Sequence, residues 1–252
     1  MKIWLTAKRA FMSFWYPYVR ALNSTWPSIT IQGKRLAIMP DVYKPLENEQ
    51  ACAKYCQDGA RVLDLGCGSG VCTVFCAPKA REVVAVDISL AAVKNTEENC
   101  RLLGLKNVTV KQSDMFSNVE GKFDLILANP PYVAVEFENE EEQFATSVRY
   151  LPTLFAHVGE HLAEDGLLLV QFPIWFRKRI EKLGSGHGLE LLEVRRVPSK
   201  SPALFLLSLL YMQVGFRSAF YLWRAKPQAG LAASGAGSES DQPRYARRAA
   251  NA

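Results

Sequence analysis

The chain has 252 residues and a formal net charge of +5, with 49% hydrophobic and 22% charged residues. This composition excludes collagen-like, coiled-coil and wholly disordered proteins, and the basic excess is too small for a dedicated nucleic-acid binder. The length suits one domain of about 200 residues with short appendages, or two small domains.

The N-terminal segment is basic and aromatic. Residues 1–40 contain six Lys or Arg and no Asp or Glu, and the first 26 residues carry seven aromatic side chains. Such a segment could lie on a membrane surface, touch nucleic acid or cover an apolar site, and a helix packed back on its own domain is the alternative. Residues 29–39 alternate around Gln32 and Gly33, which predicts a small hairpin at the end of this arm.

After residue 60, short apolar runs alternate with helical stretches. Strands are predicted at 61–65, 83–86, 107–111, 123–128, 166–171, 190–195 and 219–223. Helices are predicted at 47–57, 71–78, 89–103, 144–163 and 174–184. This alternation predicts an α/β fold with a doubly wound, Rossmann-like parallel sheet covered on both faces, whose ligand lies at the carboxyl ends of the strands.

The predicted domain boundaries follow from these patterns. The arm and hairpin occupy 1–40, the α/β domain 41–225, and a tail without periodicity, expected to be disordered, 226–252. The uncharged segment 202–216 is too short to span a bilayer, so we expect an apolar helix or lid between the last two strands, and it could wall a substrate site.

The six cysteines do not show a zinc-ligand spacing, and no metal site is expected. We interpret them as buried small hydrophobic residues with free thiols. A reducing cytoplasm is the expected location, and peripheral membrane contact through residues 1–28 is left open.

A glycine-rich segment, Asp64-Leu-Gly66-Cys-Gly68-Ser-Gly70, follows the first strand of the alternating region. Glycines at a strand-to-helix turn let a ligand approach the backbone closely. The spacing lacks the third glycine of the dinucleotide pattern, because residue 71 is a valine. The carboxylate of Asp64 suits a cationic ligand better than a pyrophosphate.

Two further acids end the next two strands. Asp87 is placed to accept hydrogen bonds from ribose hydroxyls. Asp114 can accept from an adenine amino group, while an apolar neighbour packs on the ring. These residues together indicate a site for an adenosine that carries something other than a diphosphate.

In the order and spacing of these motifs, residues 40–224 resemble the class I S-adenosylmethionine-dependent methyltransferases. The resemblance implies a seven-stranded sheet with an antiparallel last strand, S-adenosylmethionine as cofactor, and Asp64 near its methionine amino group. The candidate cofactor-binding residues are Asp64, Gly66, Cys67, Gly68, Gly70, Asp87, Ile88, Asp114, Met115 and Asn129.

The fourth strand ends in Asn129-Pro130-Pro131-Tyr132, which are the candidate catalytic residues. Two prolines stiffen the backbone and remove two amide donors. The Asn129 side-chain oxygen and a backbone carbonyl can then accept from a substrate NH2 group, and Tyr132 can stack on a planar group. This arrangement would turn the nitrogen lone pair of an amide or amine toward the methyl group.

The NPPY motif resembles that of the amino-group methyltransferases, which include release-factor glutamine N5-methyltransferases, methyltransferase-small proteins and N6-adenine enzymes. The segment Asp41-Val-Tyr43-Lys-Pro45-Leu-Glu47-Asn48 is similar to the Y-E-P-x-E-D loop of one release-factor branch, with Lys44 and Asn48 as departures.

We therefore expect methyl transfer to a planar amide or amine, with a protein glutamine or a small molecule favoured over nucleic acid. The acidic run 136–142 would repel phosphate, which supports this preference. The alternatives are an N6-adenine methyltransferase acting on RNA or DNA, and a cofactor-binding scaffold without catalysis.

Overall fold

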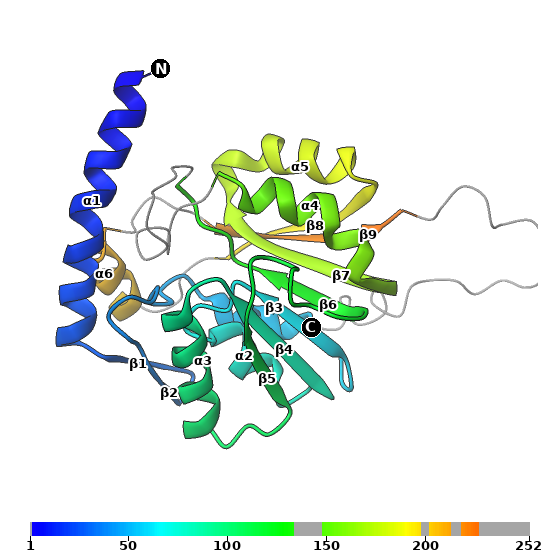
Figure 1. Ribbon diagram of the computed structural model, residues 1–252, viewed down its shortest axis with the longest axis horizontal. Coiled ribbons are helices and arrows are strands. Elements are labelled where there is room, and N and C mark those ends of the chain that lie inside the picture. The colour runs from blue at the N-terminus through cyan, green and yellow to red at the C-terminus, as the bar shows by residue number, and fades with distance from the viewer. Residues whose placement is uncertain (1, 134–147, 198–201, 213–217, 227–252) are drawn as a thin grey trace, which may run out of the picture.

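The computed structural model describes residues 2–133, 148–197, 202–212 and 218–226 (Figure 1). A seven-stranded sheet, in the order β5-β4-β3-β6-β7-β9-β8, forms its centre. The strands are β3 (Arg61–Leu65), β4 (Glu82–Asp87), β5 (Val108–Gln112), β6 (Phe123–Ala128), β7 (Leu162–Pro173), β8 (Leu189–Arg196) and β9 (Ser218–Ala225). Only β9 runs antiparallel to its neighbours β7 and β8, which confirms the expected mostly parallel sheet with an antiparallel last strand.

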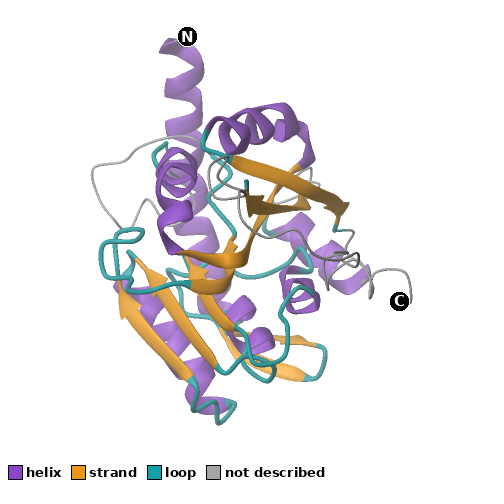
Figure 2. Cartoon of the chain, turned by 90° about the vertical axis from the view of Figure 1, so that its right-hand side faces the viewer, coloured by secondary structure: helices purple, strands orange, loops and turns teal. Residues whose placement is uncertain are grey.

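Helices cover both faces of the sheet, as Figure 2 shows. They are α2 (Val71–Cys76), α3 (Leu90–Leu102), α4 (Tyr150–His161) and α5 (Arg177–Gly186). Consecutive side chains of a strand point to opposite faces. In β6, Leu125 and Leu127 therefore pack in the apolar cluster that contains α2, whereas Ile126 and Ala128 pack in the cluster that contains α4 and α5.

The N-terminal arm forms helix α1 (Lys2–Thr25) and the hairpin β1 (Ser28–Ile31) and β2 (Lys34–Ala37). Gln32 and Gly33 both have positive φ, 46° and 80°, which is the geometry of a tight two-residue hairpin turn. One side of α1 buries Met12, Trp15 and Val19 in the same cluster as α2, so this part of the arm packs on its own domain. The division of the chain at residue 40 stays a prediction.

Two predicted helices differ from the structure. Within 47–57 the chain forms only a 3-10 helix, η1 (Glu49–Lys54), and Asn48 before it is left-handed with a φ of 67°. The left-handed residue interrupts the helical path at the start of this segment. The predicted helix 174–184 begins with a 3-10 turn, η3 (Ile174–Phe176), before α5.

The apolar segment after β8 contains helix α6 (Pro202–Leu210), which lies beside α1 in Figure 1. This confirms a helix between the last two strands. Residues 213–216 of the predicted segment lie outside the described residues, as do the acidic run 136–142, residues 144–147 of the fourth predicted helix, and residues 227–252 of the predicted tail. Within the described part of the chain, no helix is long and apolar enough to cross a membrane.

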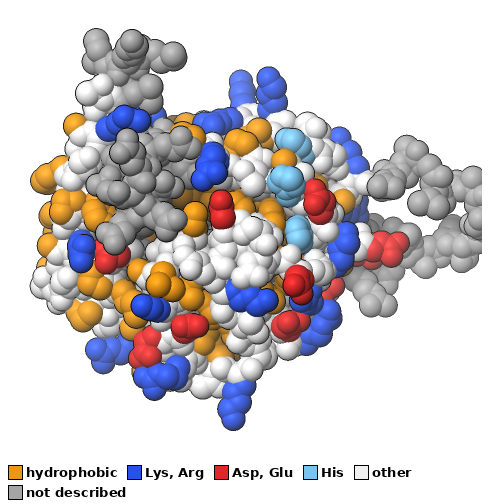
Figure 3. All heavy atoms as spheres, viewed as in Figure 1, with side chains coloured by type: hydrophobic (Ala, Val, Ile, Leu, Met, Phe, Trp, Pro, Cys, Tyr) orange, Lys and Arg blue, Asp and Glu red, His pale blue; other side chains and the backbone are white. Residues whose placement is uncertain are grey.

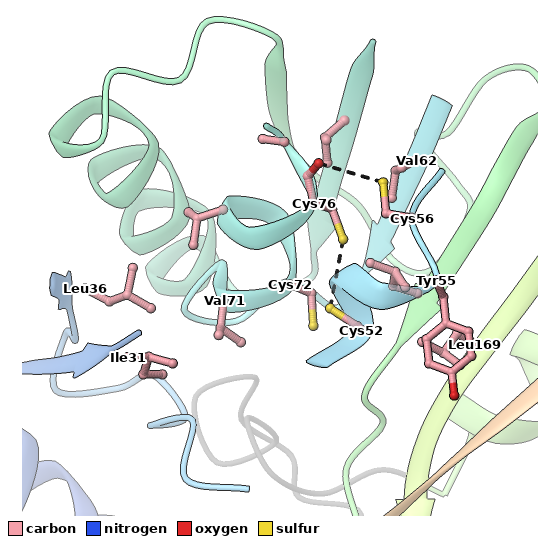
Figure 4. Close-up of a cluster of buried hydrophobic side chains, with 14 of the residues drawn as sticks. Ile31, Leu36, Cys52, Tyr55, Cys56, Val62, Val71, Cys72, Cys76 and Leu169 are labelled. Carbon is pink, nitrogen blue, oxygen red and sulfur yellow. Dashed lines mark hydrogen bonds between the residues drawn. The ribbon is translucent and has the colours of Figure 1, made fainter. Parts of the chain in front are cut away.

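The six cysteines are all free and buried, which agrees with their interpretation as small hydrophobic residues. Figure 4 shows Cys52, Cys56 and Cys76 between η1, α2 and β3, with 3.9 Å between the sulfur atoms of Cys52 and Cys76. This distance is a van der Waals or weak S–H contact and is far longer than a disulfide bond. No group of metal-ligating side chains is found among the described residues.

Candidate functional site

A cavity of about 370 Å³ opens at the carboxyl ends of β3, β4, β5 and β6. The sheet order reverses between β3 and β6, because the chain proceeds outward from β3 through β4 to β5 and then returns to β6 beside β3. Open α/β sheets bind ligands at this switch point. All the residues predicted from the sequence to bind the cofactor, apart from Gly70, line the cavity, and so do residues 129–132.

The glycine loop between β3 and α2 forms one wall. Gly66 has a φ of 78°, and a Cβ atom there would lie 3.2 Å from the Tyr150 hydroxyl oxygen. That hydroxyl donates to the carbonyl of Leu65, so Tyr150 is held against the loop. Gly70 has a φ of 76°, and its missing Cβ leaves room for Thr96 on α3. The loop conformation therefore requires glycine at both positions.

Asp87 holds the glycine loop at the end of β4. Its Oδ2 accepts from the backbone N–H of Gly68 at 2.9 Å, and its Oδ1 accepts from the N–H of Ser89 at 2.9 Å. Burial raises the pKa of Asp87 despite these hydrogen bonds. Because each carboxylate oxygen can accept more than one bond, both retain capacity for a ligand hydroxyl.

Asp64 connects the end of β3 to α2. Its Oδ2 accepts from both the backbone N–H and the hydroxyl of Thr73, at 3.0 and 2.6 Å. Burial raises the pKa of Asp64 to about 7, and the nearby Cys76 and Asp87 add to this effect. A cationic ligand group in the cavity would favour the ionised carboxylate.

Asp114 and Met115 follow β5, the strand that lies beside β4 and its Asp87. Met115 has a φ of 51°, and Ser113 fixes the turn by donating to the Met115 carbonyl and accepting from the Asn118 N–H. Ile88 lines the same part of the cavity. The side chain of Cys67 is buried and accepts from the Thr96 hydroxyl at 3.3 Å, so its sulfur joins the loop to α3.

Asn129 and Tyr132 line the cavity directly after the end of β6. The Tyr132 hydroxyl lies 3.1 Å from Asn129 Oδ1, and its ring packs edge-on against Phe172 at 5.6 Å between centroids. Burial and the nearby Glu47 raise the pKa of Tyr132, so the hydroxyl stays protonated and can donate. When the Tyr132 hydroxyl donates a hydrogen bond to Asn129 Oδ1, this oxygen keeps one lone pair that can accept from a ligand N–H group.

Glu47 and Glu49 are site residues that sequence analysis did not select. A Glu47 oxygen accepts from Ser218 and lies 3.3 Å from the Tyr132 hydroxyl. Glu49 accepts from the backbone N–H groups of Leu46 and Glu47, which holds this loop in the cavity wall. Burial raises the pKa of Glu47 to about 8 and that of Glu49 to about 7. The sequence signal that could have identified Glu47 and Glu49 is the similarity of the loop containing Tyr43 and Pro45 to the release-factor loop.

Lys44 and Asn48, the two residues at which this loop departs from the release-factor pattern, both make hydrogen bonds in the structure. Lys44 is buried and donates to the carbonyl of Trp26 at 2.6 Å, with its ammonium 5.1 Å from the Tyr211 ring centroid. It therefore joins the loop to the segment that follows α1. Asn48 accepts from the Gln50 side chain at the start of η1.

The model of the methyltransferase small domain matches residues 51–188, more than half of the chain. A protein of Methanocaldococcus jannaschii, provisionally named protein N5-glutamine methyltransferase, is 39% identical over 119 residues, which are 46% of this chain and 60% of that protein. The ribosomal protein L11 methyltransferase of Caldanaerobacter subterraneus subsp. tengcongensis is 31% identical over 189 residues, 65% of this chain and 56% of the relative. The chain thus spans less than two thirds of either relative.

Among solved structures, a methyltransferase from Pyrococcus furiosus superposes with a TM-score of 0.59. The match covers 85% of this chain and 98% of that one, at 15% sequence identity. At this identity the similarity shows a shared fold alone, and it agrees with the strand order described above.

Proposed function

Because the chain belongs to the methyltransferase small domain family of S-adenosylmethionine-dependent enzymes, we propose that it methylates the nitrogen of a planar amide or amine held at residues 129–132. One observation carries this proposal. Asn129 Oδ1, the Tyr132 hydroxyl and the Glu47 carboxylate are linked in a cavity that also contains the glycine loop and Asp87.

The charges of the cavity residues complement those of S-adenosylmethionine. Asp64 and Asp87 have raised pKa values because they are buried, and among the described residues the groups that shift them include no cation. When bound, the cofactor supplies an electrophilic methyl group on a positively charged sulfur, and it also carries an ammonium group. These charges would compensate the buried carboxylates.

We assign the cofactor contacts residue by residue. Asp64 would face the ammonium group, while the glycine loop and Cys67 would border the methionine portion. The carboxylate of Asp87 would accept from the ribose hydroxyls, with Ile88 beside it. Asp114 would accept from the adenine amino group, and Met115 would pack on the ring.

Asn129 would hold the methyl acceptor through a hydrogen bond that its side-chain oxygen accepts from an N–H group of that molecule. Pro130 and Pro131 lack backbone N–H donors, so this turn presents acceptors to the substrate. The bond from Tyr132 fixes the direction of the Asn129 oxygen, and most of the rate gain would come from this positioning. The stacking role expected for the Tyr132 ring stays a prediction.

Glu47 is the carboxylate best placed to take up the proton that the methylated nitrogen releases. It lines the cavity and reaches the Tyr132 hydroxyl, and its raised pKa of about 8 is near the operating pH of a proton acceptor. Neutral amides and amines therefore suit this site as nucleophiles.

A protein glutamine or a small-molecule amide or amine is favoured over nucleic acid as the acceptor. Five acids but only one base, Arg149, are among the described residues that line the cavity, so the lining becomes negative as its carboxylates ionise and then repels a phosphate backbone. The names of the two sequence relatives make a glutamine side chain the first protein acceptor to test. The six free, buried thiols support a reducing compartment such as the cytoplasm.

The test is transfer of a labelled methyl group from S-adenosylmethionine into a host-cell extract separated into protein, nucleic-acid and organic-soluble fractions. Label in protein or in small molecules, lost with Asn129→Ala, is the expected result. Label in RNA or DNA would establish the adenine alternative instead. Cofactor binding without transfer into any fraction would favour a scaffold without catalysis.

A further inference from the structure

One wall of the cavity is apolar. It consists of Phe11, Met12 and Trp15 of α1 together with Val133 and Met212, and we call these five residues the apolar wall. Four of them pack in a single hydrophobic cluster, and Phe11 is the chain neighbour of Met12. Met12 is 3% and Trp15 is 6% exposed, so the inner side of α1 faces the cavity and not the solvent.

The apolar wall adjoins the residues that are proposed to hold the methyl acceptor. Val133 directly follows Tyr132 in the chain. Leu46, the residue before Glu47, packs in the same hydrophobic cluster as the apolar wall. Met115, to which the adenine is assigned, packs in the other cluster, which contains α4. The apolar wall therefore belongs to the acceptor side of the cavity rather than to the adenine side.

Hydrogen bonds fix α1 to the loop that carries Glu47. The Tyr16 hydroxyl donates to the carboxylate of Asp41 at 2.7 Å. The side-chain amide of Asn23, near the other end of the helix, donates to the carbonyl of Val42 at 2.8 Å. Because both acceptors lie in this loop, α1 is held in place beside the site and forms a permanent part of its wall.

The apolar wall offers almost no hydrogen bond to a ligand. The Trp15 indole N–H, its one polar group, donates to the carbonyl of Tyr211 at 2.9 Å, which also fixes the neighbouring Met212 beside α1. Phenylalanine and valine side chains have no polar atom, and a methionine sulfur is a weak acceptor. A polar group held against this wall would lose its water without replacement, whereas an apolar group gains free energy by leaving water.

We infer that the methyl acceptor carries an apolar group beside the amide or amine that is methylated, and that this group lies against the apolar wall. The inference rests on the proposed function, because it takes Asn129 and Glu47 as the groups that face the reacting nitrogen. In such a site a few polar groups fix the orientation of the ligand and the apolar lining selects its shape. The apolar wall thus determines which acceptor binds and takes no part in the transfer itself.

Binding of primary amides tests this inference without requiring methyl transfer. The full chain is first saturated with S-adenosylhomocysteine, the form of the cofactor that has lost its methyl group. The probes are acetamide and hexanamide, whose dissociation constants are measured by ligand-observed NMR titration. Each methylene group moved from water into an apolar site strengthens binding about fourfold. We therefore expect hexanamide, which has four more methylene groups, to bind about tenfold tighter or more.

Phe11→Ser should lower the preference for hexanamide about threefold or more, because apolar contact area is lost. Phe11 is 48% exposed, so its replacement leaves the core intact. Phe14→Ser, about one turn further along α1, is the matched control, because Phe14 is 61% exposed and does not line the cavity. Figure 3 shows hydrophobic side chains along the edge of the molecule where α1 and α6 lie, and this control separates that outer surface from the cavity.

A second variant tests another segment of the apolar wall. Val133→Thr keeps the shape of the side chain and adds a hydroxyl, so it should also weaken the binding of hexanamide more than that of acetamide. The affinity for S-adenosylhomocysteine and the unfolding midpoint show whether each variant is folded. Hexanamide that binds no tighter than acetamide to the unchanged chain would overturn the inference, and so would equal losses for Phe11→Ser and Phe14→Ser.

The extract experiment separates the possible sources of the apolar group. Label in the organic-soluble fraction that Phe11→Ser lowers more than Phe14→Ser assigns this group to a small molecule. Label in protein that falls in the same way assigns it to an apolar residue next to the methylated side chain. A methylated side chain with only glycine or polar neighbours would overturn the inference. Tight binding of hexanamide without methyl transfer into any fraction would count against the proposed function alone.

Discussion

The Tyr132 hydroxyl lies 3.1 Å from Asn129 Oδ1, and the same hydroxyl is within hydrogen-bond distance of Glu47 and Ser218. A phenol carries one proton, so only one of its acceptor partners can receive it at a time. With Ser218 donating to Glu47, the Tyr132 proton is available for Asn129. Tyr132 is therefore placed to position the residue that would hold the methyl acceptor.

Tyr132→Phe removes this hydroxyl and keeps the ring against Phe172. We expect kcat to fall about tenfold, which corresponds to the loss of one buried hydrogen bond, with little change in cofactor affinity. Steady-state kinetics with the acceptor identified by the extract experiment would measure kcat and KM separately. Tyr55 lies in the turn after η1, and its ring packs on Phe220. Tyr55→Phe is therefore the control and should retain full kcat. Equal kcat for Tyr132→Phe and the unchanged chain would refute the positioning role.

Asn129→Ala tests the acceptor site directly. Loss of the side-chain amide should reduce turnover about 100-fold, because the acceptor nitrogen is no longer held in line with the methyl group. The cofactor dissociation constant should change little, as the glycine loop and Asp87 are untouched. Asn118→Ala, whose side chain donates to the carbonyl of Gln112, is the matched control. Full activity of Asn129→Ala would disprove the proposed role of residues 129–132.

Asp87→Asn should weaken cofactor binding. The amide retains one oxygen, so it can accept from only one of the Gly68 and Ser89 N–H groups and offers less to a ribose. We expect the dissociation constant for S-adenosylmethionine to rise about tenfold or more, since charge-assisted bonds are lost. Titration calorimetry measures this change. Asp58→Asn, in the turn before β3, should bind the cofactor normally, and an unchanged constant for Asp87→Asn would exclude its ribose role.

Gly70→Ala should destabilise the loop more than an ordinary glycine substitution does. A Cβ at this position would lie 2.9 Å from Cγ2 of Thr96, and the φ of 76° is unfavourable for alanine. Gly104→Ala is a matched control, because its φ is 65° but nothing lies within 4 Å of the added atom. Both variants should lose about 1 kcal/mol from backbone strain, and Gly70→Ala about 1–3 kcal/mol more from the clash. Urea unfolding gives the difference, and equal losses would contradict it.

The sheet and the cofactor loop could be predicted because their signals are local. Short apolar runs mark the strands, and the segment from Asp64 to Gly70 folds within one turn between β3 and α2. The acids after β4 and β5 follow the same rule, since the carboxyl ends of parallel strands meet at one edge. The single seven-stranded sheet and its antiparallel last strand came from the resemblance that these local motifs support, and the strand order was not predicted.

The acceptor side of the site could not be predicted in the same way. Glu47 and Ser218 contact Tyr132 across 85 and 86 residues of sequence. No periodicity or spacing indicates that three elements so far apart will meet. Similarly, the aromatic arm left four interpretations open, and the contact between Trp15 and Tyr211, 196 residues apart, shows that α1 packs on its own domain with α6.

The stability of the protein without ligand should fall as pH rises from about 4 to 8. Burial raises the pKa of Glu47 from 4.5 to about 8, of Glu49 from 4.5 to about 7, and of Asp64 from 3.8 to about 7. Within this pH window the folded protein retains protons that the unfolded chain has lost, so the free energy of unfolding decreases with increasing pH. Above this window the dependence on these groups ends.

Glu47→Gln removes one of these groups while keeping its size, so its unfolding midpoint should depend less steeply on pH than that of the unchanged chain. Thermal unfolding at several pH values between 5 and 8, about one unit apart, measures both slopes. Glu97→Gln on α3 is the control, because this exposed residue lies outside the cavity. If Glu47→Gln and Glu97→Gln show the same slope as the unchanged chain, Glu47 is already ionised in the folded protein over this range, and the raised pKa assigned to it is wrong.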